Sequence, residues 1–182
     1  MWYSLIILHA YTGQPTFSGT HGPKLELRQN NTEGWRYEGG CWAVGFGSQR
    51  LPVGWTLEFN ITERVCCWLA NMNVGISYVS PDDIEPWDLV LCDPNITDSL
   101  NYTQVFVFER FYSDDNVYRF WVDHDGNAHL TPNVTDDGIV FSGVDVKKPF
   151  WPIFNVYGDT QAVQLVKLTA TTNDWLTNIV SC

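Results

Sequence analysis

Residues 150–166, FWPIFNVYGDTQAVQLV, contain two apolar runs separated by a short polar segment. The first run is apolar on both faces, which predicts an inner strand of a sheet. Pro152 within it predicts either a bulge or a position whose missing backbone donor is not needed. Tyr157, Gly158 and Asp159 form the predicted turn into an alternating strand from Ala162 to Val166. The stretch therefore predicts two strands joined by a tight turn.

Alternation with a period of two recurs along the rest of the chain, and no window has the apolar spacing of an amphipathic helix. It occurs in TLEFNITE (56–63), TQVFVFERF (103–111), VYRFWVDHDGNAHL (117–130) and AVQLVKL (162–168). Within the third of these, Asp125 and Gly126 predict a primed two-residue hairpin turn. The pattern predicts an all-β fold, an antiparallel two-sheet β-sandwich or a barrel.

Several segments also follow one another in a characteristic order. They are Phe17-Ser18 with His21-Gly22 and KLEL (24–27), WAVGFGSQRLPVG (42–54), NVGIS (73–77), YRFWVDHDGNAHL (118–130) and VFSGVDVKKPFWPIFNVYGDTQAVQLV (140–166). Together they resemble the blocks of the neuralized homology repeat, a SPRY-like jelly-roll sandwich, and the last block is the most specific. The resemblance spans residues 16–168. Residues 1–15 are an extra strand or extension, and residues 169–182 are a C-terminal extension of the same domain.

The resemblance implies a module that binds protein ligands through surface loops. In the neuralized family such domains usually accompany a RING domain that carries ubiquitin-ligase activity. The cysteine and histidine spacing of this chain cannot build a RING, so we expect no ligase activity in it. Pro152 and Asn155 depart from the expected last block.

Composition narrows the choice of partners. Apolar residues make up 45% of the chain and charged residues 17%, which is typical of a globular domain. A net charge of −11 argues against nucleic acid and against anionic membranes. The segment MWYSLIIL (1–8) is too short to span a bilayer. We therefore expect a protein, a peptide or a small apolar ligand as the partner, with no nucleic acid and no membrane insertion.

Aromatic residues provide the main indication of a ligand surface, since the chain has nine Trp, ten Phe and eight Tyr. Trp121 shares a strand face with Arg119, opposite the predicted core face. Other rings lie near predicted loops. The candidate ligand-binding residues are Trp35, Tyr37, Trp42, Trp87, Trp121 and Arg119. Packing in the core or between sheets is the alternative for each Trp.

Five Asn-x-Ser/Thr sequons predict N-glycosylation and therefore a secreted protein. They lie at Asn30, Asn60, Asn95, Asn101 and Asn133. The alternative is an intracellular domain whose asparagines serve polar turns. The disulfide candidates are Cys41, Cys66, Cys67, Cys92 and Cys182. Because their number is odd, one thiol stays free or links two copies, and Cys182 is the candidate link of a homo-oligomer.

Catalytic motifs of the familiar hydrolase, zinc-protease and nucleotide-binding types are absent from the sequence. His124 and His129 flank the predicted hairpin turn and could seed a metal site with Asp123 or Asp125, although solvated turn residues are the alternative. The candidate catalytic residues are His21, His124 and His129. For His21 the choice is between a general base and a structural hydrogen-bonding residue. We expect no cofactor and no metal, and the sequence leaves open whether the chain is an enzyme.

The sequence thus supports two classes of function. The first is a secreted, glycosylated sandwich that recognises a protein or peptide through loops and an aromatic surface. The second is a secreted small-molecule binder or cofactor-free enzyme of the oxygenase or luciferase type, with a Trp-lined pocket. A lectin and an intracellular adaptor of a ubiquitin ligase are further alternatives.

Overall fold

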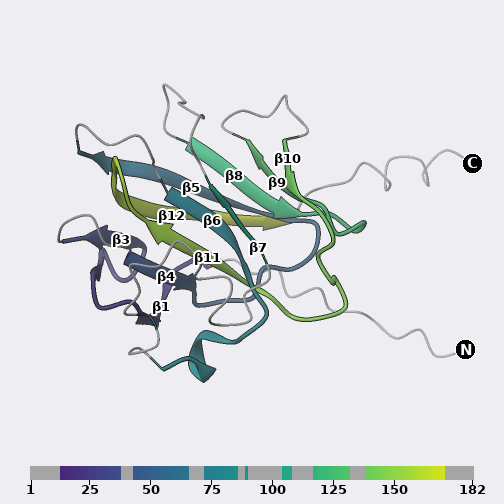
Figure 1. Cartoon of the computed structure of the whole chain (residues 1–182), viewed down its shortest axis with the longest axis horizontal. Coiled ribbons are helices and arrows are strands. Elements are labelled where there is room, and N and C mark those ends of the chain that lie inside the picture. The colour runs from purple at the N-terminus through teal and green to yellow at the C-terminus, as the bar shows by residue number, and fades with distance from the viewer. Residues whose placement is uncertain are drawn as a thin grey trace, which may run out of the picture.

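The computed structural model describes residues 13–37, 43–65, 72–85, 89, 104–107, 117–131 and 138–170. Within these residues the chain is almost entirely β-structure (Figure 1). Its elements are β1 (Phe17–His21), β2 (Leu25–Arg28), β3 (Glu33–Arg36), β4 (Ala43–Gly47), β5 (Trp55–Arg64), β6 (Met72–Ser77), the 3-10 helix η1 (Pro81–Asp83), β7 (Gln104–Val107), β8 (Val117–Val122), β9 (Ala128–Thr131), β10 (Ile139–Phe141), β11 (Trp151–Val156) and β12 (Thr160–Ala170).

The strands form two antiparallel sheets, and the predicted all-β two-sheet sandwich is confirmed. The five-stranded sheet has the order β1-β4-β11-β6-β7, and the seven-stranded sheet has the order β10-β9-β8-β5-β12-β3-β2. Figure 1 shows the strands of the two sheets lying over one another. None of the described residues belongs to a helix long and apolar enough to cross a membrane.

The stretch 150–166 supplies an inner strand to each sheet. β11 lies between β4 and β6 in one sheet, and β12 lies between β5 and β3 in the other. The turn between them is closed by a hydrogen bond of 3.2 Å from the Thr160 amide to the Tyr157 carbonyl, and Gly158 has a φ of 61°. The predicted turn at Tyr157-Gly158-Asp159 is therefore confirmed, and it carries the chain from one sheet to the other.

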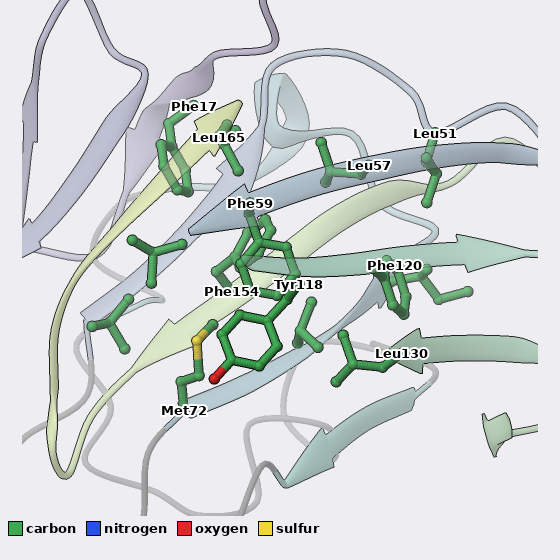
Figure 2. Close-up of a cluster of buried hydrophobic side chains, with 14 of the residues drawn as sticks. Phe17, Leu51, Leu57, Phe59, Met72, Tyr118, Phe120, Leu130, Phe154 and Leu165 are labelled. Carbon is green, nitrogen blue, oxygen red and sulfur yellow. The ribbon is translucent and has the colours of Figure 1, made fainter. Parts of the chain in front are cut away.

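Aromatic rings from both sheets meet in the centre of the sandwich (Figure 2). The ring of Phe154 on β11 contacts Phe17 edge to face at 5.6 Å and Phe59 at 5.2 Å between ring centres. Phe59 stacks in turn on Tyr118 at 5.5 Å. All four rings are buried. Because these rings come from β1, β5, β8 and β11, they hold the two sheets together.

Pro152 lies in β11 without interrupting it. The ladder between β11 and β4 begins at Ile153, one residue further on, and both ladders of β11 keep their register. Of the two predicted alternatives, the second is therefore observed: Pro152 lies at a position where the missing backbone donor is not needed. The proline ring occupies the space above Gly47 of β4, where a Cβ would lie 2.5 Å from Pro152 Cγ. Glycine at position 47 thus makes room for the ring.

The outer face of the five-stranded sheet is covered over part of its area. Val44, Phe46 and Ile153 form a second buried cluster there with Ile84 and Leu89, which belong to the segment after η1. Ile84 and Leu89 therefore pack against the sheet, and Ser80 and Asp82 lie close to Trp151 at the start of β11.

The hairpin between β8 and β9 differs from its prediction. A primed turn needs a positive φ at both central residues, but among the described non-glycine residues only Gln29, Asn30 and Asn31 have one. The observed loop spans five residues, 123–127, with Gly126 at a φ of 80°. The carboxylate of Asp123 closes it, because it accepts hydrogen bonds from the amides of Asp125 (2.9 Å) and Asn127 (2.8 Å).

Candidate ligand-binding pocket and sheet face

Several loops meet at one end of the sandwich and enclose an open pocket of about 550 Å³. β4 ends there, β11 begins there, and the pairing of Trp151 with Ser77 brings the end of β6 to the same place. β12 ends there too, since Ala170 pairs with Trp55 at the start of β5. The pocket is lined by Ser48, Gln49, Arg50, Pro52, Ser80, Asp82, Trp151 and Leu168.

Arg50 and Trp151 are the two largest side chains of this pocket. The guanidinium carbon of Arg50 lies 5.2 Å from the centre of the Trp151 ring, which is the geometry of a cation–π contact. Trp151 is only 8% exposed, whereas Arg50 is exposed to solvent. Among the described residues, no carboxylate forms an ion pair with Arg50. Its donors are therefore available to a ligand.

The backbone holds the loop of Arg50 in place. The amide of Leu51 donates to the carbonyl of Phe150 over 3.0 Å, and the amide of Ser48 donates to the carbonyl of Thr16 over 2.8 Å. Next to Arg50, the Oε1 atom of Gln49 is buried and accepts no hydrogen bond from any described residue.

Trp121 and Arg119 lie together on the outer face of the seven-stranded sheet, as the alternation predicts. Trp121 stacks on His129, with 4.6 Å between ring centres and an angle of 4° between the planes. Arg119 forms an ion pair of 3.2 Å with Glu58 on β5. Both predicted ligand-binding residues thus already have partners within the sheet.

Trp35 and Tyr37 do not join that group. They belong to the β3 side of the same sheet, with β5 and β12 between β3 and β8. Arg28 lies over Trp35 at 3.8 Å, and the indole N–H of Trp35 donates to Glu63 over 2.8 Å. Tyr37 is 44% exposed, and its hydroxyl donates to the carbonyl of Pro23. The predicted aromatic residues are therefore divided between two separate groups.

The histidines have different surroundings. His124 is exposed beside Gly54, whereas His129 is buried and lies opposite Trp121 across the ladder, so the two do not face each other. His129 Nε2 lies 2.9 Å from Asp123 Oδ2. His21 Nδ1 lies 2.9 Å from the carbonyl oxygen of Gly22. In the part of the chain that the structure describes, no three histidine, cysteine or acidic side chains are close enough to hold a metal.

Asp123 is the most strongly perturbed acid among the described residues. Burial raises its pKa, but hydrogen bonds from His129, from the amide and side chain of Asn127 and from the amide of Asp125 outweigh burial and lower the pKa to about 2. A carboxylate with a lowered pKa stabilises the fold above its unfolded pKa near 4, and this stabilisation is lost as the pH falls toward 2.

We therefore expect Asp123→Asn to reduce the free energy of unfolding at pH 7 by about 1 kcal/mol, a value kept small because the carboxylate is partly exposed. The difference from the unmodified chain should shrink between pH 4 and pH 2 in urea denaturation. Asp125→Asn is the control, since its side chain is exposed in the same loop. A difference that stays constant with pH would contradict this account.

Some predicted residues lie outside the described part of the chain. They are Trp42, Trp87, Asn95, Asn101, Asn133, Cys41, Cys66, Cys67, Cys92 and Cys182, together with the predicted N-terminal strand. Of the sequons, Asn30 is exposed in the turn between β2 and β3, and Asn60 is half-buried on β5.

The sequence patterns did not single out Arg50 and Trp151 as a site. Trp151 belongs to an apolar run that indicates only a strand. An available signal was the segment SQRLP (48–52), which places an arginine between two predicted strands in a chain with only ten basic residues.

Comparison with solved structures defines the class of this fold. The chain superposes with a TM-score of 0.78 on the crystal structure of the neuralized NHR1 domain of Drosophila melanogaster, with 18% identity, covering 85% of this chain and 99% of that one. It superposes with a TM-score of 0.52 on the PSpry domain of TRIM65, with 10% identity, covering 85% and 93% of the two chains. These similarities place the chain among the SPRY-like β-sandwiches.

The model of the Neuralized family matches residues 17–167, and the chain belongs to that family. It is 22% identical over 150 residues to protein neuralized of Drosophila virilis, covering 82% of this chain and 20% of that protein. It is 24% identical over 129 residues to the human E3 ubiquitin-protein ligase NEURL3, covering 70% and 49%. The predicted resemblance is confirmed, and the chain spans between a fifth and a half of the length of these relatives.

Proposed function

We propose that this chain is a protein-recognition domain that binds a peptide segment of its partner in the loop pocket around Arg50 and Trp151. The observation that carries the proposal is the exposed guanidinium of Arg50 over the Trp151 ring, at the edge of an open pocket of about 550 Å³. A cation with available donors beside an aromatic ring suits a peptide better than a purely apolar molecule.

The chemistry of the pocket indicates which kind of peptide segment it would bind. An acceptor oxygen of the ligand, such as a carboxylate, would take hydrogen bonds from Arg50. A flat or apolar group of the ligand would lie against Arg50 and the small exposed part of Trp151. Because the domain carries a net charge of −11, a segment with a single acidic group within a neutral or basic sequence fits best.

The proposal favours the intracellular adaptor among the alternatives that the sequence left open. Its support is membership of the Neuralized family and similarity to a human protein named as an E3 ubiquitin-protein ligase. In this setting the domain would select the protein that a ligase modifies. The cofactor-free oxygenase or luciferase alternative gains no such support from these relatives.

Secretion and glycosylation remain predictions. The mass of the native protein before and after enzymatic glycan removal tests both. Of the two described sequons, Asn30 is the exposed one. An unchanged mass supports the intracellular setting proposed here, and a loss of mass contradicts it.

The binding test uses a phage-displayed library of peptides from intracellular proteins, selected on the full chain. For the selected peptides we expect Arg50→Glu to weaken binding by at least tenfold in fluorescence anisotropy, because a charge-assisted hydrogen bond is lost. Arg119→Ala on the outer sheet face is the matched control, since it removes another arginine that is already paired with Glu58.

The two variants separate the competing surfaces. Binding that is lost with Arg50→Glu and retained with Arg119→Ala supports the pocket. Binding that is retained with Arg50→Glu and lost with Arg119→Ala would contradict the proposal and would favour the sheet face that the sequence predicts.

A further inference from the structure

The sandwich has an open side where both sheets end. β1 is the edge strand of the five-stranded sheet, and β2 is the edge strand of the seven-stranded sheet. In Figure 1, β1 and β3, the strand next to β2, lie at the same side of the molecule. A groove of about 590 Å³ runs between the two edges, lined by Gly19, His21, Leu25, Glu26, Leu27, Asn31 and Tyr37.

The edge of β2 has backbone groups without partners among the described residues. The amide of Tyr37 donates to the carbonyl of Lys24, which lies directly opposite it in the ladder between β2 and β3. This bond shows which residues of β2 direct their backbone groups toward β3: Lys24 and every second residue after it. Because alternate residues of an antiparallel strand direct their backbone groups to opposite sides, Leu27 directs its N–H and C=O away from β3. No described residue forms a hydrogen bond with these groups.

Leu25 adds a third group to this edge. Its amide is used, since it donates to the carbonyl of Gly22 over 3.0 Å. Its carbonyl points away from β3, by the same alternation as that of Leu27, and no described residue donates to it. The carbonyl of Leu25 and the N–H and C=O of Leu27 therefore form an acceptor-donor-acceptor row, which matches one further extended strand.

We propose that an extended peptide from a partner protein pairs with β2 and adds an eighth strand to the seven-stranded sheet. Side chains on the inner side of this peptide would enter the groove over Gly19 and His21, and those on the outer side would lie beside Glu26. This mode of recognition draws affinity from the main chain and specificity from alternate side chains. The site is separate from the loop pocket, and the inference does not depend on that pocket.

The negative charge of the chain indicates which peptides would bind to this edge. Glu26 has 52% of its side chain exposed on the outer face of β2, where it already forms an ion pair of 3.0 Å with Arg28, and the whole chain carries a charge of −11. A lysine or arginine in the peptide would be attracted by this net negative charge. Acidic peptides would be repelled. The occupant is therefore a neutral or basic strand with apolar residues at alternate positions.

A second copy of the chain fits this edge less well. Two copies would each bring a charge of −11 to the contact. β2 has only four residues, so pairing of β2 with its own copy would bury far less surface than the roughly 1,200 Å² that stable interfaces need. A single peptide needs no such area.

Gly19 allows a specific test, because a Cβ built on it meets no atom within 4 Å. Gly19→Tyr would place a ring at the groove, and its Cβ would meet no native atom. Gly13→Tyr is the matched control, since Gly13 also has open space around it and lies outside the groove. Leu27→Pro is a second variant, which removes the edge donor itself while leaving the bonds to β3 in place.

The experiment selects random twelve-residue peptides on phage with the full chain and removes those that also bind Gly19→Tyr. We expect the remaining peptides to contain lysine or arginine and alternating apolar residues. Their affinity should fall at least tenfold with Gly19→Tyr and with Leu27→Pro. It should be unchanged with Gly13→Tyr and with Arg50→Glu. Peptide binding should also slow hydrogen exchange at the Leu27 amide, which a ligand in the loop pocket would not do.

Other outcomes would overturn the inference. These are failure to select any peptide that Gly19→Tyr rejects, or selected peptides that leave exchange at Leu27 unchanged. Sedimentation of a dimer that Gly19→Tyr dissociates would assign the edge to a second copy instead. Loss of binding with Arg50→Glu alone would support the loop pocket and reject the edge, so the two proposals can fail separately.

Discussion

Phe154→Ala should lower the free energy of unfolding by about 3–5 kcal/mol, the range for removing a large buried aromatic side chain. Phe154 is fully buried and contacts Phe17 and Phe59 edge to face. These rings come from three strands in two sheets, so the cavity left by alanine would open at the joint between the layers. The surrounding strands are held by their ladders and can collapse only partly into this space.

Urea denaturation followed by tryptophan fluorescence measures the effect of Phe154→Ala. Phe154→Leu should cost clearly less, because leucine fills most of the volume. Tyr37→Ala is the surface control and should change stability by less than about 0.5 kcal/mol, since Tyr37 is 44% exposed. Equal losses for Phe154→Ala and Tyr37→Ala would contradict the central position assigned to the ring.

Gly126→Ala should destabilise the chain by about 2–4 kcal/mol, through backbone strain and overpacking together. Gly126 has a φ of 80°, and a Cβ there would lie 2.5 Å from the carbonyl oxygen of Val144. The same glycine accepts a hydrogen bond of 3.0 Å from the amide of Val144. The substitution would therefore push the hairpin of β8 and β9 away from the loop that precedes β11.

Gly143→Ala separates the two causes. Gly143 has a φ of 86°, but a Cβ there meets nothing within 4 Å. Gly143→Ala therefore introduces backbone strain without a steric collision, and it should lower the free energy of unfolding by about 1 kcal/mol. Thermal unfolding of both variants measures the difference. If Gly143→Ala costs as much as Gly126→Ala, the contact with Val144 contributes nothing.

Most of the fold could be predicted because it depends on local patterns. Alternation in residues 56–63 and 118–122 identifies strands whose buried faces are fixed by the side-chain period of two. The turn type at residues 123–127 could not be predicted in the same way. The pair Asp125-Gly126 suggests a primed turn, but the carboxylate of Asp123 stabilises a longer loop by accepting hydrogen bonds from two amides.

The candidate site was less predictable, since it depends on contacts between distant segments. The sequence placed Trp121 and Arg119 correctly on one sheet face, but the stacking of Trp121 on His129 follows from the register of β8 with β9. The approach of Arg50 to Trp151 requires the loop after β4 to lie beside the start of β11. No periodicity within either segment contains that information.

The ring of Pro152 above Gly47 also bears on how the chain reaches its folded state. β11 is inserted between two strands that come from distant parts of the sequence, so it has to select its alignment from several alternatives. A slip of one residue would turn every side chain of β11 to the opposite face. It would also bring the proline ring against a residue that has a Cβ, because Phe46 and Ser48 flank the glycine. We therefore expect Pro152 and Gly47 to disfavour misaligned pairing of β11 with β4 while the sheet forms.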